Sequence, residues 1–179
     1  MSTHRPLPFP FPFPLPFSIA FAAACCGASL ASAGDAFRFE EPTGESVALF
    51  EGARPVLVYN HGVIEPPAGV PADRARSSYV HPLYGLDGEV LTDDFPKDHF
   101  HHRGLFWAWP HVRVGGEHHD LWMLQGIAHR FENWIAREAD ATGATLAAEN
   151  GWYVGERRVM REEVRLRAWP SGQDSQALD

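Results

Sequence analysis

Cysteine is almost absent from this sequence. The two that occur, Cys25 and Cys26, are adjacent in an apolar N-terminal stretch. We interpret residues 1–33 as a secretory signal peptide, because an apolar run leads to Ala31-Ser32-Ala33, a small-residue triplet typical of cleavage sites. The mature chain would then be secreted or periplasmic, and it would contain no disulfide, no thiolate metal ligand and no cysteine nucleophile.

Basic residues are also scarce. The chain carries 15 Lys and Arg against 23 Asp and Glu, a formal net charge of −8. Nucleic-acid phosphates need a basic surface, so this balance argues against a nucleic-acid partner. After the leader, no apolar stretch is long enough to span a bilayer as a helix. Phosphate-binding glycine loops, dinucleotide fingerprints and Gly-x-Ser-x-Gly are missing, which removes the usual support for nucleotide and serine-nucleophile chemistry.

Long helical patterns are missing as well. Instead, short strand-like segments recur with Gly, Pro or Asp between them, a pattern that predicts an all-β antiparallel β-sandwich over residues 34–170, followed by a polar tail at 171–179. The expected strands are residues 36–41, 46–50, 54–60, 77–81, 89–92, 104–109, 127–135, 145–149 and 158–169. Residues 104–109 are apolar on both faces, which predicts a strand that is buried on both sides.

Histidine is concentrated in one part of the chain. Nine of the ten histidines lie between His61 and His129, and three of them fall in the loop expected at residues 94–103. In an extended segment, His99 and His101 point to the same side, a familiar arrangement for two metal ligands. One hypothesis is therefore a divalent-metal site. Its other ligands stay open among Asp94, Asp98, His81, His118 and His119.

A second hypothesis for the same loop needs no metal. His101 or His102 beside Asp94 or Asp98 can act as a general acid and base near neutral pH. Arg103 can hold an oxygen-rich ligand, or it can pair structurally with a neighbouring aspartate. The bland alternative for the histidines is that they are hydrogen-bonded loop residues.

Further candidates for binding flank this loop. His81 precedes a proline that fixes the backbone, and Tyr84 carries a hydroxyl, so we consider His81 catalytic and Tyr84 substrate-binding. Trp107 and Trp109 are candidate flat platforms for sugar rings, with core packing as the alternative. The expected ligand is a small molecule or a carbohydrate.

Two motifs resemble a known family. The segment Ser78–Gly85 and the pattern Pro96-x-Asp98-His99-x-His101-His102-Arg103-Gly104 are similar to exported bacterial domains labelled methane oxygenase PmoA, with the similarity running from about Tyr59 to Trp134. Phe100 stands where many relatives carry proline. The resemblance implies that His81 and residues 98–103 form one site. Because such relatives are longer, it also implies an incomplete sandwich of the galactose-mutarotase-like supersandwich kind.

These observations leave three functional hypotheses. The first is a secreted carbohydrate-active enzyme that uses His/Asp acid–base chemistry in an aromatic-lined groove. The second is a copper- or iron-dependent oxygenase, which the label of the resembled family implies. The third is a non-catalytic carbohydrate-binding module.

Overall fold

The computed structural model describes residues 36–172. The predicted signal peptide and most of the predicted polar tail lie outside the described residues. Residues 36–172 contain nine β-strands, one short 3-10 helix (η1, Ala72–Arg74) and no α-helix. The predicted all-β antiparallel fold is therefore confirmed.

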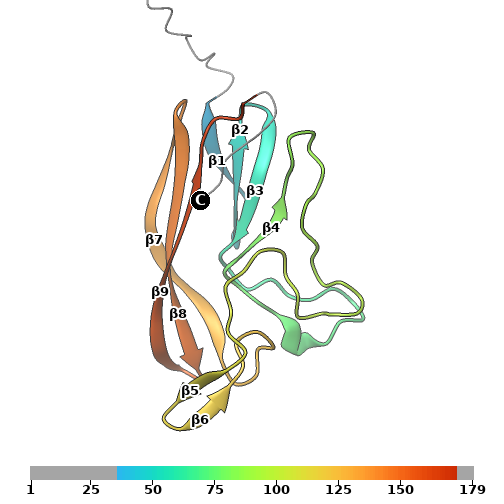
Figure 1. Ribbon diagram of the computed structural model, residues 1–179, viewed down its shortest axis with the longest axis vertical. Helices are drawn as coiled ribbons and strands as arrows, with labels where there is room; N and C mark the ends of the chain where they lie inside the picture. Colours follow the sequence, from blue (N-terminus) through green and yellow to red (C-terminus); the bar gives the residue numbers. More distant parts are fainter. Residues whose placement is uncertain (1–35, 173–179) are drawn as a thin grey trace, which may run out of the picture. The chain divides into compact units, whose positions relative to one another are not determined.

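The strands form three antiparallel sheets (Figure 1). The first has the order β1 (Phe37–Thr43), β2 (Ser46–Glu51), β3 (Arg54–Asn60) and β4 (Tyr79–Leu83). The second is a small hairpin of β5 (Val112–Val114) and β6 (Glu117–His119). The third has the order β7 (Ala128–Asp140), β8 (Gly143–Val154) and β9 (Arg157–Ala168).

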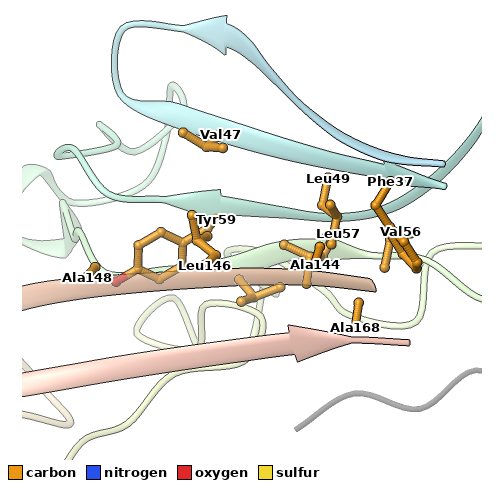
Figure 2. Close-up of a cluster of buried hydrophobic side chains, with 11 residues drawn as sticks. Phe37, Val47, Leu49, Val56, Leu57, Tyr59, Ala144, Leu146, Ala148 and Ala168 are labelled. Carbon is orange, nitrogen blue, oxygen red and sulfur yellow. The ribbon is translucent and has the colours of Figure 1, made fainter. Parts of the chain in front are cut away.

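The main core lies between the first and third sheets. Figure 2 shows side chains of β2 and β3, among them Leu57 and Tyr59, directed toward β8 and β9. From the other side, Leu146 and Ala148 of β8 and Ala168 of β9 complete the cluster. Burial of these apolar side chains on two facing sheets is the interaction that defines a sandwich.

Turn residues and side-chain alternation explain most of these strands. Nearly all residues of β3 are apolar, which favours a central position in a sheet, and β3 lies between β2 and β4. Residues 158–169 alternate between apolar and charged side chains, and β9 follows this pattern with Val164 and Leu166 packed on the core. The strand expected at residues 89–92 is reduced to a single bridge between Tyr84 and Val90.

The prediction of a doubly buried strand at residues 104–109 is wrong. Only Leu105 pairs there, with Val80 of β4, and Leu105, Trp107 and Trp109 each expose more than half of their surface. The ladder cannot extend because Pro82, on one side of Val80, has no N–H to donate. On the other side, Ser78 has a φ of 63° and gives its N–H to Asn60.

Candidate functional site

The histidine-rich loop is a short hairpin. Asp94 bridges Arg103, the Gly104 N–H donates to the Asp93 carbonyl at 2.7 Å, and two turns at residues 96–102 close the end. Gly104 has a φ of 55°, and a Cβ there would lie 2.1 Å from the carbonyl oxygen of Val80. The hairpin is thus pressed directly onto β4, where only a glycine fits.

Arg103 anchors this hairpin from beneath. Its side chain is 0% exposed, and its guanidinium donates to the Asp94 carboxylate, to the Tyr79 hydroxyl and, at 3.0 Å, to the Arg74 carbonyl oxygen. Its guanidinium carbon also lies 3.5 Å from the ring centroid of Phe95. A ligand in solvent does not reach a side chain this deeply buried. The geometry therefore gives Arg103 a positioning role, in agreement with the structural alternative considered for it.

The three histidines of the hairpin gather around one tryptophan. The rings of His99 and His102 stack, with centroids 4.8 Å apart and planes 9° apart, and the His101 ring lies 4.4 Å from that of His102. Trp122 contacts both His101 and His102, at centroid distances of 6.2 and 5.5 Å. We call these four residues the His–Trp cluster.

One member of the His–Trp cluster, His101, has a lowered pKa. Burial lowers the pKa of His101, and the neighbouring His102 and His99 lower it further. Asp98 lies on the outer side of the hairpin, where its own backbone N–H and the His99 ring hold the pKa of its carboxyl below its ordinary value. Its carboxylate is 3.0 Å from His99 Nδ1. Asp98 thus pairs with His99 rather than with His101 or His102.

The other candidates lie beside the hairpin. His81 Nδ1 is 2.9 Å from the Thr92 hydroxyl, and among residues 36–172 no ring contact joins His81 to the three hairpin histidines. Tyr84 is held by its backbone N–H, which donates to the Val56 carbonyl at 2.9 Å. Trp107 is exposed, and Trp109 is exposed on one side while its ring approaches that of Trp152, with centroids 6.3 Å apart.

Sequence reasoning missed a second buried arginine, Arg76. Its Nη2 donates to the carbonyl oxygens of Leu121 and Trp122 at 2.9 and 2.7 Å, and its guanidinium carbon lies 4.2 Å from the ring centroid of Phe106. Burial, together with the nearby Arg103, lowers the pKa of Arg76 to about 10. Arg76 thereby fixes the backbone that presents Trp122. No sequence motif marks it, because its acceptors are backbone carbonyls distant along the chain.

The nine histidines of the described residues do not assemble a recognisable metal centre. Across residues 36–172, no group of three or more His, Cys, Asp or Glu side chains is placed to hold a metal ion. The suggested additional ligands have other partners: Asp94 bonds Arg103, and His118 Nε2 is 3.0 Å from His111 Nδ1. The assignment of His99 and His101 as metal ligands stays a prediction from the sequence.

Comparison with known proteins corrects the resemblance noted above. No helix in the described part of the chain has the length and apolar character needed to cross a membrane. No curated protein and no solved structure matches the chain, so the mutarotase-like expectation stays a prediction. The family model that matches, over residues 46–179, is that of a family of unknown function, DUF6807, and no PmoA-like model matches. The assignment to PmoA is therefore wrong, and the oxygenase hypothesis loses the label on which it rested. Because the matching model covers most of the sequence, the chain belongs to the DUF6807 family.

Proposed function

We propose that the protein is a carbohydrate-active enzyme whose site is the His–Trp cluster, with His101 as the acid–base group and Trp122 as the sugar platform. The observation that carries the proposal is the contact of His101 and His102 with the partly exposed ring of Trp122. It joins an apolar surface to proton-transfer groups at one place.

The composition of the cluster suits a sugar. The C–H face of a pyranose stacks on an indole ring, and its hydroxyls exchange hydrogen bonds with imidazole nitrogens. Trp122 exposes 36% of its surface, so one part of its ring is open to a ligand while another packs on the histidines. The chain's net charge of −8 disfavours strongly anionic ligands and is compatible with a neutral sugar.

The lowered pKa of His101 suits proton transfer. A neutral imidazole has a free lone pair on one nitrogen, so at neutral pH it can take a proton from a sugar hydroxyl and return it in a later step. The Asp98–His99 pair on the same turn places a carboxylate–imidazole couple beside His101. Catalysis of this kind requires fixed geometry, which Arg103 and Arg76 supply from below.

The proposal predicts that a change at Trp122 weakens sugar binding, whereas a change at His101 lowers kcat. Purified protein would be screened for binding and turnover of mono- and oligosaccharides, and Trp122→Ala and His101→Gln would then be compared on the sugar that responds. Trp122→Ala should weaken binding by about tenfold or more, because stacking contributes about 1–3 kcal/mol. His101→Gln should bind normally and lose about 100-fold or more in kcat, the usual contribution of a general acid–base group.

Matched controls exist for both variants. Trp169 exposes 40% of its surface beyond the end of β9, so Trp169→Ala removes a similar indole from another place. His111, exposed beside β5, serves the same purpose for His101. Wild-type protein that binds sugars without turnover would be a binding module, and a fully active His101→Gln variant would remove His101 from the chemistry.

The pH dependence gives an independent test of the base. The pKa of His101 is lowered from 6.5, so protonation should disable it only below that pH. The value of kcat/KM should therefore be flat through neutral pH and fall as the pH drops below about 6.5. An acid limb that persists unchanged in His101→Gln would assign the titration to another group.

A further inference from the structure

A pocket lies between the first and third sheets, apart from the His–Trp cluster. It has a volume of about 230 Å³ and is open to solvent on one side. Its lining is mostly apolar. The apolar side chains around it include those of Val80, Leu105, Trp107, Val164 and Leu166. A pocket with apolar walls and a few convergent polar groups is the usual form of a small-molecule site.

One carboxylate enters this apolar pocket. Glu162 of β9 lines it, and the Glu162 side chain is only 12% exposed. Its Oε2 accepts a hydrogen bond from Asn150 Nδ2 at 3.2 Å and lies 3.5 Å from His129 Nε2. Both of these contacts fall on Oε2.

The carboxylate is held in its charged form. Burial alone would raise the pKa of Glu162, but His129, Asn150 and Trp152 outweigh it and hold the pKa below its ordinary value. An ionised carboxylate in partly apolar surroundings attracts a positive charge more strongly than one in open water, because the local dielectric constant is lower.

Two aromatic side chains that line the pocket also favour a cationic ligand. Tyr59 also lines the pocket, and burial raises its pKa to about 12, so its ring stays a neutral phenol. Trp107, which exposes 63% of its surface to solvent, also lines the pocket. Indole and phenol faces attract cations through their quadrupoles. An anionic group beside such rings thus selects a cation with an apolar body.

We propose that this pocket binds a small organic ammonium ion. Its charged head meets Glu162 and its apolar body lies against Val164, Leu166 and Trp107. The volume admits a ligand of about one ring and a short chain, smaller than a typical drug-sized ligand. This site is independent of the carbohydrate proposal, since it uses no residue of the His–Trp cluster.

The test compares two probes of nearly equal shape on the full chain at pH 7. Phenethylammonium carries the charge, and 2-phenylethanol replaces it with a neutral hydroxyl. Binding is followed by titration of the tryptophan indole N–H signals in NMR spectra, with the Trp107 signal assigned through Trp107→Phe. The cation should bind about tenfold more tightly than the alcohol, because a charge-assisted hydrogen bond exceeds a neutral one by about 1.4 kcal/mol or more.

Single substitutions test whether the two probes bind in this pocket. Glu162→Gln should reduce cation affinity about tenfold and leave the affinity for the alcohol unchanged, again because the charge-assisted hydrogen bond is lost. The matched control is Glu163→Gln, which removes an exposed carboxylate on the opposite face of β9 and should change neither affinity. Trp107→Ala, at a side chain too exposed to support the fold, should weaken both probes.

Three results would overturn the proposal. They are equal affinity for the two probes, no binding of either probe, and cation binding that survives Glu162→Gln in a folded protein. Should Glu162→Gln fail to fold, the probe comparison on wild-type protein and on Trp107→Ala decides by itself.

Discussion

The sandwich of β1–β4 with β7–β9 and the long connection through residues 84–127 are stabilised in different ways. The sandwich buries aliphatic side chains such as Val56 and Leu146. The connection has few strands and is held by two buried arginines. Arg103 lies within it, and Arg76, from the loop between β3 and β4, reaches its Leu121 and Trp122 carbonyls. Arg103 donates to a carboxylate, a phenol and a backbone carbonyl, and Arg76 donates to two carbonyls.

The difference follows from where backbone groups find partners. In the sandwich, strand ladders satisfy the N–H and C=O groups, so the side chains between the sheets can be purely apolar. In an irregular connection the carbonyls lack such partners, and a guanidinium with five donors can satisfy several at once. In the connection, buried guanidinium groups therefore satisfy backbone carbonyls that strand ladders satisfy in the sandwich.

The largest expected effect is that of Arg103→Ala. The variant leaves Asp94 without its cation and the Arg74 carbonyl without its donor, and breaking a buried pair in this way costs about 3–5 kcal/mol. The free energy of unfolding in urea measures it. Arg165→Ala, which breaks only the exposed pair with Glu163 on β9, should cost less than about 1 kcal/mol. If the two losses are equal, Arg103 is not an anchor of the connection.

Leu146→Ala tests the apolar core of the sandwich. Leu146 is buried between the sheets, so its truncation should cost about 3 kcal/mol through lost burial and the cavity left behind. Leu105→Ala is the control, because Leu105 was expected to be buried and is exposed. A loss for Leu105 as large as that for Leu146 would contradict its exposure. Thermal unfolding followed by circular dichroism compares them directly.

The contrast also explains how far the sequence could predict the structure. Strands β1, β2, β3, β7, β8 and β9 have local signals, namely alternating side chains and the Gly, Pro and Asp residues between them. The stretch Gly104–Trp109 has the same apolar signal, yet its pairing depends on Ser78 and Pro82, which lie more than twenty residues earlier. The apolar pattern of one segment cannot show that the neighbouring strand lacks free N–H groups to form a hydrogen-bonded ladder with it.

For the candidate site too, the sequence predicted what has a local signal and missed what depends on distant residues. The density of histidines located the hairpin, and the structure brings His99, His101 and His102 together. The burial of Arg103 and the role of Arg76 depend on distant backbone carbonyls. Glu162 lies on the same face of β9 as Val164 and Leu166, because side chains two residues apart on a strand point the same way, but no local pattern shows that this face holds a pocket.

Gly104→Ala tests the junction between the two regions. Alanine at a φ of 55° is strained, and its Cβ would lie 2.1 Å from the Val80 carbonyl oxygen, so we expect a loss of about 2–3 kcal/mol. Gly115→Ala has a similar φ of 60° with nothing nearby, and should cost only about 1 kcal/mol. The difference, measured by urea unfolding, isolates the contact between hairpin and sheet. Equal losses would mean that the hairpin does not press on β4.

The smallest expected effect comes from the ionised carboxylate within the sandwich. The pKa of Glu162 is lowered from 4.5 on folding, so the folded state binds its proton less readily than the unfolded state. Its contribution to stability is therefore fully present above about pH 4.5 and is lost as the pH falls through the lowered value. Unfolding of wild type and Glu162→Gln between pH 7 and pH 3 should show curves that converge on acidification. A Glu162→Gln curve that stays parallel to wild type would show that the carboxylate is no better stabilised in the folded sandwich than in the unfolded chain. The sandwich would then hold no stabilised charge, and the contrast with the arginine-anchored connection would be complete.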